Sequence, residues 1–261
     1  MKVCMENITI FDPVDEARFA VENGFDGFEL AIEYPSSTPD HVLSKRRELV
    51  DVLSSGSLYR LVHVPTFVDI SNFYDELREA SVRVTLKAME AAHAIEAEVV
   101  VVHPGFRFPL TPRDVSFRNT VQSLSRLLEV AEEYGFVLGV ENLPPGVFPG
   151  ADYFTCVDDF RELFSQLGSE RLKFTLDIAH ASIKPSDPPL KFIEELRGHI
   201  VHVHISDNFG SRDDHLPLGV GRIDYKTPLK VLKKEGYSET VTLEVFTPER
   251  EYLILSKKKI L

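Results

Sequence analysis

Residues 202–219, which read HVHISDNFGSRDDHLPLG, gather many side chains that can bind a metal ion or carry a proton. Three of the nine histidines of the chain lie in this stretch, together with three aspartates. Burying so many polar groups costs free energy unless each one finds a partner. His204, Asp213 and His215 are therefore candidate metal ligands, although a solvated polar loop is the alternative for the last two. Their partners must come from elsewhere in the chain.

The ends of six apolar segments supply such partners. Each segment ends in a histidine or a carboxylate, and the intervals between these residues are 40, 38, 36, 27 and 40, about one strand plus one helix each. The residues are His63, His103, Glu141, Asp177, His204 and Glu244. One such residue alone is more often structural, because it can be hydrogen bonded or can cap the following helix. Six in succession indicate a divalent cation as their simplest shared partner.

The types of these side chains narrow the choice of metal. Imidazole and carboxylate groups without a thiolate suit Zn, Mn, Fe or Co better than Ca or Mg. We expect Zn or Mn as the cofactor, with one ion bound, or as many as three. His180, three residues after Asp177, can reach the same site. His202 precedes His204 by two residues, so the strand period turns it to the same side, and we expect it one layer deeper.

The elements that must position these residues alternate along the chain. Helical patterns such as 73–95 and 114–134 separate eight β-rich runs, which lie at 2–8, 26–32, 59–65, 98–103, 136–141, 172–177, 199–205 and 239–245. Several runs are almost continuously apolar, as expected for parallel strands that are covered on the outside. No GxGxxG follows the first run, which disfavours a doubly wound open sheet. The α/β pattern therefore predicts one domain, a (β/α)8 TIM barrel over residues 1–261.

Composition limits the partners of the protein. The formal net charge of −12 disfavours a nucleic acid, since most of the surface would repel a phosphate backbone. Only Cys4 and Cys156 are present, which does not indicate a disulfide framework or a cysteine-rich zinc site. No segment has the pattern of a signal peptide or the length of a membrane span. We expect a cytoplasmic protein with no membrane partner, and the sequence leaves a homo-oligomer open.

Seven motifs occur along the chain in the order VHVP, VVVHPG, VENLPP, LDIAHA, HVHISDN, DDHLPLGVGRIDY and LEVF. Through these motifs the chain resembles the xylose-isomerase-like TIM-barrel superfamily over nearly its whole length. That superfamily includes sugar and sugar-phosphate isomerases and epimerases. The resemblance implies that one divalent ion is held by Glu141, Asp177, His204 and Glu244. It also implies that Glu141 and Glu244 act as acid and base on a small carbohydrate, which passes through an enediolate, while His180 positions or protonates a substrate oxygen.

Endonuclease IV belongs to the same superfamily and is the alternative. The resemblance to it implies a multinuclear zinc site for hydrolysis of abasic DNA, with ligands at His63, His103, Glu141, Asp177, His180, His204, Asp213, His215 and Glu244. The early loops disfavour this alternative. The segments TIFDP and EYPSSTPD are short and acidic, and Glu29 and Glu33 are expected where a phosphate backbone would have to pass. A non-catalytic barrel, stabilised by a metal or binding a ligand, is a third hypothesis, which is disfavoured because structural metal sites are usually saturated with protein ligands.

Residues that contact the rest of the substrate are predicted from the loops. Arg212 is the candidate for an anionic substrate group, and His63 and His103 are further candidate substrate contacts. The loop after 98–103 offers alternative cations in Arg107, Arg113 and Arg118. The loop after 136–141 offers a hydrophobic wall, or equally a dimer contact, in Phe148, Tyr153 and Phe154.

Overall fold

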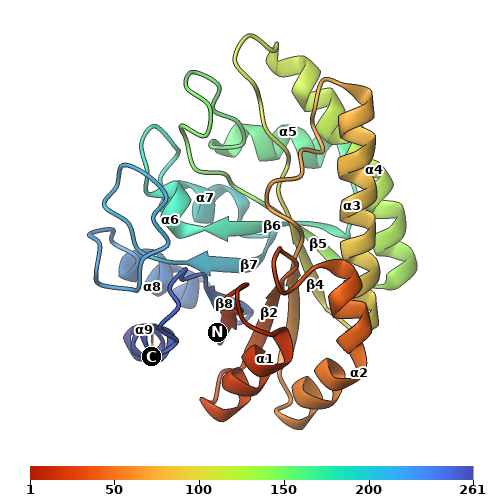
Figure 1. The fold of residues 1–261 in the computed structure, drawn as a ribbon. Helices are drawn as coiled ribbons and strands as arrows, with labels where there is room; N and C mark the ends of the chain where they lie inside the picture. Colours follow the sequence, from red (N-terminus) through yellow and green to blue (C-terminus); the bar gives the residue numbers. More distant parts are fainter. Residues whose placement is uncertain (261) are drawn as a thin grey trace.

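A computed structural model describes residues 1–260, and within them eight parallel strands close into a barrel (Figure 1). Each strand pairs with its neighbours in sequence order, and β1 pairs with β8 through Val3 opposite Val241. The strands are β1 (Lys2–Glu6), β2 (Gly27–Ala31), β3 (Tyr59–His63), β4 (Val99–Val102), β5 (Val137–Glu141), β6 (Leu172–Asp177), β7 (Ile200–Ile205) and β8 (Thr240–Leu243). The predicted TIM barrel is confirmed, with every strand inside its predicted run.

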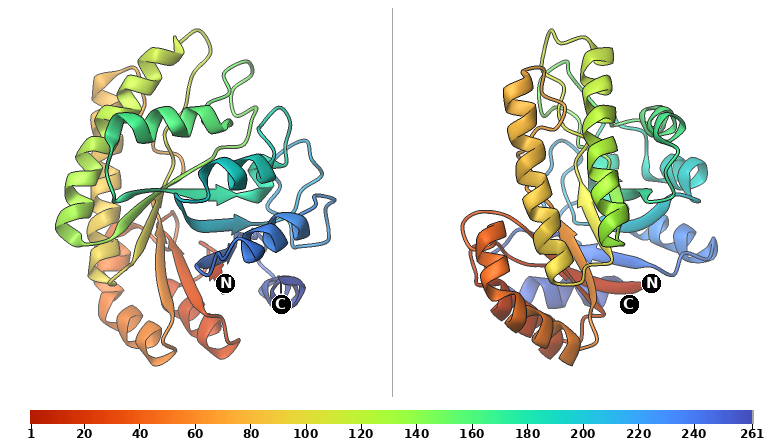
Figure 2. Two further views of the ribbon diagram at one scale, coloured as in Figure 1. Left: turned by 180° about the vertical axis from the view of Figure 1, so that it is seen from behind. Right: turned by 90° about the vertical axis from the view of Figure 1, so that its right-hand side faces the viewer.

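Helices surround the barrel and fill the intervals between the strands. They are α1 (Pro13–Glu22), α2 (Pro39–Ser55), α3 (Asp75–Ala94), α4 (Arg113–Tyr134), α5 (Val157–Leu167), α6 (Ile178–Ala181), α7 (Pro189–Leu196), α8 (Lys226–Lys234) and α9 (Glu251–Ile260). The long helices α3 and α4 run side by side on the outer face (Figure 2). Helix α3 begins two residues later than predicted, because the Asn72 side chain accepts a hydrogen bond from the Tyr74 amide in a turn before it.

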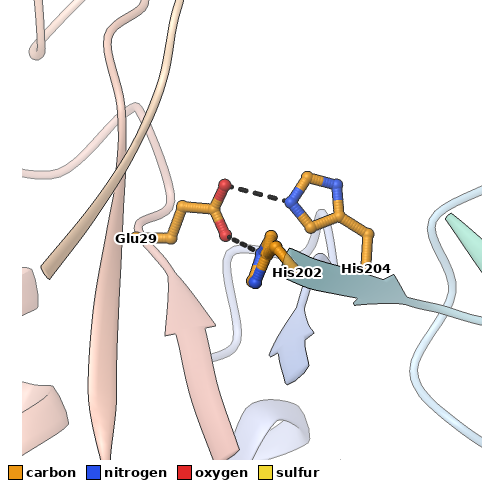
Figure 3. Close-up of side chains that lie close together, drawn as sticks. All are labelled: Glu29, His202 and His204. Carbon is orange, nitrogen blue, oxygen red and sulfur yellow. Dashed lines mark hydrogen bonds and ion pairs between the residues drawn. The ribbon is translucent and has the colours of Figure 1, made fainter. Parts of the chain in front are cut away.

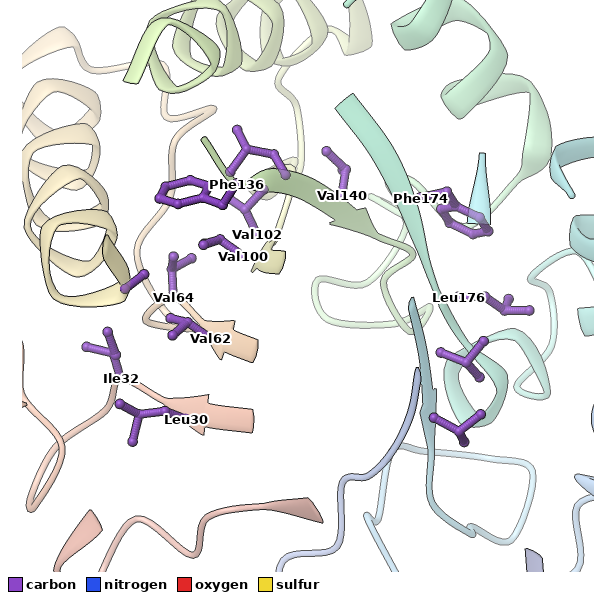
Figure 4. Close-up of a cluster of buried hydrophobic side chains, with 14 of the residues drawn as sticks. Leu30, Ile32, Val62, Val64, Val100, Val102, Phe136, Val140, Phe174 and Leu176 are labelled. Atoms are coloured by element: carbon purple, nitrogen blue, oxygen red, sulfur yellow. The ribbon is translucent and has the colours of Figure 1, made fainter. Parts of the chain in front are cut away.

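Alternate residues of each strand face the helices and form the main hydrophobic core (Figure 4). On β6, Phe174 packs against Phe160 of α5 and Phe192 of α7, with ring centroids 4.6 and 5.5 Å apart. The intervening residues face the barrel axis. At the amino-terminal end of the barrel these are Cys4, Leu61 and Val99, which form a small separate apolar cluster. Burial on both faces explains why the strands read as nearly continuous apolar runs.

The barrel interior becomes polar toward the carboxyl ends of the strands. On β7, Val203 and Ile205 belong to the outer core, whereas His202 and His204 face inward. The parallel direction of the strands places the last residues of β3, β5 and β6 at one rim. Within residues 1–260, no helix combines the length and the hydrophobicity needed to cross a bilayer.

Candidate metal centre and substrate cavity

Four side chains from neighbouring strand ends converge at the carboxyl-terminal rim. Glu141, Asp177 and His204 come from β5, β6 and β7, and Glu244 follows β8 directly. Each offers one ligand atom, these atoms all lie within 4.8 Å of one another, and all four residues are buried. This is the set of four that the resemblance implied, and its spacing fits one shared cation.

Glu141 connects these four residues to two further histidines. Its Oε2 lies 3.1 Å from Nε2 of His63 and 3.2 Å from Nε2 of His103, while its Oε1 lies 3.1 Å from Nδ1 of His204. His103 stands one residue beyond β4, and His63 ends β3. Glu141 therefore belongs to two adjacent ligand groups, because its Oε2 faces His63 and His103 while its Oε1 faces His204.

Beside the group of Glu141, Asp177, His204 and Glu244 and the group of His63, His103 and Glu141, a third ligand group lies around Asp213. Oδ2 of Asp213 is 3.0 Å from Nε2 of His180 and 2.6 Å from Nε2 of His215. The amide of His180 donates a 2.6 Å hydrogen bond to Oδ1 of Asp177, which holds the short helix α6 at the rim. The structure thus gathers all nine candidate ligand residues into three adjoining groups.

The buried carboxylate of Asp207 joins the two ends of the loop that carries Asp213 and His215, and a backbone bridge between Asp207 and Leu216 adds to it. Oδ2 of Asp207 accepts hydrogen bonds from the amides of Gly219 and Gly221, at 2.8 and 3.1 Å. Its Oδ1 accepts from the amides of Asn208 and Ile223, at 2.9 and 3.2 Å. Asp207 therefore ties both ends of the loop together, which fixes the approach of Asp213 and His215 to the rim.

One layer deeper, Glu29 of β2 lies inside the barrel and bridges two histidines of β7 (Figure 3). Its Oε1 is 3.0 Å from Nε2 of His204, and its Oε2 is 2.9 Å from Nε2 of His202. His202 also contacts the Thr240 hydroxyl through Nδ1, at 2.6 Å. The expectation that Glu29 lies on the path of a phosphate backbone is wrong, because the strand period turns it into the barrel. The deeper position predicted for His202 is confirmed.

Unpartnered oxygens test whether these residues fit a metal ion. Oδ2 of Asp177, Oδ1 of Asp213 and Oε2 of Glu244 are buried and have no hydrogen-bond partner within residues 1–260, and the same holds for Oε2 of Glu6 at the end of β1. Buried carboxylate oxygens without partners are costly. A divalent cation among Glu141, Asp177, His204 and Glu244 would satisfy the oxygens of Asp177 and Glu244, whereas the oxygen of Asp213 belongs to the separate group with His180 and His215. The mixed nitrogen and oxygen donors suit Zn or Mn. Glu6 went unnoticed in the sequence although it ends β1, at the same rim.

The pKa values of Glu141 and Glu244 are shifted in opposite directions. Burial would raise the pKa of Glu141, but the charge of His204 and hydrogen bonds from the surrounding histidines hold that pKa well below its usual range. Burial raises the pKa of Glu244 well above its usual range, against the opposing charge of His204. Burial would lower the pKa of His180, but the charges of Asp177 and Asp213 outweigh it and raise that pKa to about 10.

A cavity of about 1270 Å³ opens above these groups. His103, His180, Asp213, His215 and Glu244 line its floor, and Glu6 also reaches it. Loops after β1, β2, β3, β4, β5 and β8, together with one stripe of α3, form its walls. Of the four residues of the candidate metal centre, Glu244 lines this cavity, so a ligand in the cavity would reach the centre from the side of Glu244. A catalytic site needs such access, whereas a structural site is saturated with protein ligands.

The predicted arginine contacts lie away from this cavity. Arg212 does not line it; its side chain is 82% exposed and pairs with Asp214. Arg107 donates a hydrogen bond to the Gly150 carbonyl, Arg113 pairs with Asp159 and Glu162, and Arg118 pairs with Asp114. None of these three side chains lines the cavity either. The substrate contact of Arg212 stays a prediction, and the sequence could not give its direction because a loop residue has no periodicity.

The predicted aromatic wall is present in part. Phe148 lines the cavity. Phe154 instead packs into the core, stacked on Phe117 and edge-on to Phe160. Tyr153 is buried, and its hydroxyl lies 2.8 Å from that of Thr120. The role of a cavity wall is therefore wrong for Tyr153 and Phe154, which fold back beneath the loop.

Comparison with known proteins agrees with this architecture. An uncharacterized protein of Methanocaldococcus jannaschii is 33% identical over 232 residues, which cover 85% of this chain and 75% of that protein. A fructoselysine 3-epimerase of Escherichia coli O157:H7 is 24% identical and covers 90% of this chain and 86% of its own. A probable endonuclease 4 of Mycobacterium bovis is 26% identical, with coverage of 86% and 87%.

A solved structure is similar over its full length. The crystal structure of a D-tagatose 3-epimerase-like protein is 26% identical, covers 100% of both chains and superposes with a TM-score of 0.83. A family model described as a xylose isomerase-like TIM barrel matches residues 17–258. The chain therefore belongs to the xylose isomerase-like TIM-barrel family.

Proposed function

We propose that the protein is a divalent-metal-dependent isomerase or epimerase of a small sugar, keto-sugar or sugar phosphate. One observation carries this proposal. Glu141, Asp177, His204 and Glu244 converge within 4.8 Å, and oxygens of Asp177 and Glu244 are buried without a hydrogen-bond partner in residues 1–260. The similarity to a fructoselysine 3-epimerase and to a D-tagatose 3-epimerase-like protein supports the reaction class.

Different residues of the site have different roles in moving a proton on a substrate carbon. Glu141 and Glu244, from β5 and from the end of β8, are the acid and the base: one removes the proton and the other returns it, through an enediolate. The metal ion, when bound, supplies positive charge for the substrate oxygens and for the oxyanion that develops. His180 holds or protonates a substrate oxygen from the cavity floor, and Asp213 orients its ring at 3.0 Å.

A second candidate function is cleavage of DNA at abasic sites with a multinuclear zinc site. The observation that favours it is the presence of two further ligand groups, with His63 and His103 on Glu141 and with Asp213 between His180 and His215. The similarity to a probable endonuclease 4 supports it. Against it, no lysine or arginine of residues 1–260 lines the cavity, so beyond the histidines of the floor the cavity offers no cationic side chain to a phosphate backbone.

Exchange of a carbon-bound proton tests the proposal directly. The chain loaded with Mn or Zn should exchange a carbon-bound proton of a ketohexose, with D-tagatose among those tried, for solvent deuterium, followed by NMR. Glu244→Gln should slow this exchange by roughly 100-fold to 10,000-fold, because it removes a general acid or base. Glu249→Gln changes an exposed glutamate a few residues further on and should leave the exchange unaltered.

Two results would contradict the proposal. Exchange that persists at the wild-type rate in Glu244→Gln would remove this residue from the chemistry. Nicking of a DNA duplex at an abasic site, with about three metal ions per chain, would favour the second candidate instead.

A further inference from the structure

The cavity above the candidate metal centre is larger than a free monosaccharide needs. Cavities that enclose drug-sized ligands usually measure about 300–1,000 Å³, and this one measures about 1270 Å³. The candidate ligand residues occupy only its floor. From there the cavity extends past the loop after β3 to Leu77 and Val84 on α3. A sugar seated on the floor would therefore leave most of the cavity wall uncovered.

That wall is apolar on two sides. On one side Phe106 and Phe108 approach Phe148, and the rings of Phe108 and Phe148 lie 4.6 Å apart between centroids. On the other side Phe67 is 86% exposed and Leu77 is 54% exposed. Large apolar side chains exposed together around a cavity mark a surface that a ligand or partner covers. Their continuity with the candidate metal centre favours the substrate itself as the ligand.

The charges on the cavity wall disfavour an anionic substituent there. Among the residues that the structure describes, no lysine or arginine lines the cavity, whereas Glu6, Glu33, Asp69, Asp213 and Glu244 do. The arginines of the neighbouring loops are engaged with other groups, as described above for Arg107 and Arg113. The histidines that line the cavity, His103, His180 and His215, lie on the floor, where the polyol covers them. On the wall, a phosphate or carboxylate group would find no lysine or arginine and would face Glu33 and Asp69.

We infer that the substrate is a polyol or keto-sugar joined to a bulky, uncharged apolar substituent, and that it carries no phosphate. The polyol lies on the floor at the candidate metal centre, and the apolar substituent covers the wall between Phe148 and Phe67. The polyol end rests on the proposed function. The apolar substituent rests on the cavity alone, so it can be tested without metal or turnover.

Two glucosides that share a head group and differ only in chain length provide the test. Methyl and hexyl β-D-glucopyranoside are titrated calorimetrically into the purified chain. Each of the five added methylenes is worth up to about fourfold in affinity when buried, so hexyl glucoside should bind roughly 100-fold more tightly than the methyl compound. D-glucose 6-phosphate should bind no more tightly than D-glucose.

Matched variants assign the effect to the cavity. Phe67→Ser should reduce the preference for hexyl glucoside several-fold, whereas Leu110→Ser, which alters an exposed apolar side chain outside the cavity, should leave it unchanged. Equal affinity for the two glucosides, or no binding of hexyl glucoside at millimolar concentration, would overturn the inference. So would equal losses in both variants, tighter binding of the phosphate, or a dimer that buries Phe67. If proton exchange fails while the chain-length preference holds, the proposed function fails and the apolar subsite stands.

Discussion

At the scale of single residues, Glu29 shows how a carboxylate beneath the site can orient a candidate ligand. It is fully buried and lies 3.0 Å from Nε2 of His204, whose other nitrogen faces Glu141 and Glu244. A histidine that binds a metal through one ring nitrogen usually donates the other N–H to a carboxylate or carbonyl. Glu29 is thus placed to fix the tautomer of His204 with Nδ1 directed toward the metal centre.

Replacing Glu29 tests this positioning role. Glu29→Gln keeps the shape of the side chain but removes its charge, so it should weaken metal binding about 10-fold to 100-fold. The measurement is competition for zinc with a chromophoric chelator. Glu33→Gln, which changes a glutamate at the edge of the cavity, is the matched control and should keep wild-type affinity. Unaltered zinc affinity in Glu29→Gln would show that His204 does not depend on Glu29.

The sequence located most of the rim residues and the deeper His202, but it missed Glu6 at the rim and misplaced Glu29. His63, Glu141, Asp177 and His204 are predictable because each ends an apolar run, and parallel strands in a barrel end at a common rim. Glu29 lies inside β2, where the letters GFELA do not reveal which face is polar. Its inward direction follows only from the register, which sets it opposite Leu61 of β3.

At the scale of elements, the loop between β7 and α8 is organised around the side chain of Asp207, beside a backbone bridge between Asp207 and Leu216. Four backbone amides from both ends of this loop converge on the Asp207 carboxylate. The sequence singled out this stretch for its many polar groups, and the structure gives them different tasks. Asp213 and His215 face the cavity, Asp207 organises the loop, and Arg212 faces solvent. The role of each of these residues depends on the conformation of the loop. That conformation cannot be read from the sequence, because a loop has no regular periodicity.

Removing the Asp207 carboxylate should loosen this loop. Asp207→Ala leaves four amides without their acceptor, and it should lower the free energy of unfolding by roughly 1.5–3 kcal/mol. Hydrogen exchange followed by mass spectrometry should show faster exchange over residues 208–223 than elsewhere. Arg212→Ala, in the same loop but exposed, should leave exchange unchanged. Wild-type protection in Asp207→Ala would mean that the loop is held by other contacts.

At the scale of the whole molecule, closure of the barrel brings together residues that lie far apart in the sequence. Glu29 and His204 are separated by 175 residues and lie in contact, because the strands form a closed cylinder. The interior that they share is tightly filled. A Cβ built on Gly139 of β5 would overlap the hydroxyl of Thr175 on β6. Side chains of the right size are therefore needed across neighbouring strands to keep the strand ends in register.

A substitution at Gly139 tests this packing. Gly139→Ala should lower the free energy of unfolding by about 1–3 kcal/mol, since the added methyl group forces Thr175 or the strand to move. Gly198→Ala is the matched control, because nothing lies within 4 Å of its added methyl group, and its stability should be unaltered. Denaturant unfolding measures both. Equal stability of the two variants would show that the barrel interior around Gly139 can accommodate a methyl group without strain.

The central claim is that Glu141, Asp177, His204 and Glu244 hold one cation at the mouth of the barrel. Anomalous diffraction from crystals of the manganese-loaded chain tests it most directly. The account predicts an anomalous peak among these four side chains, within the space where their ligand atoms lie 4.8 Å or less apart. The absence of a peak there, or a peak only at another place on the molecule, would contradict it.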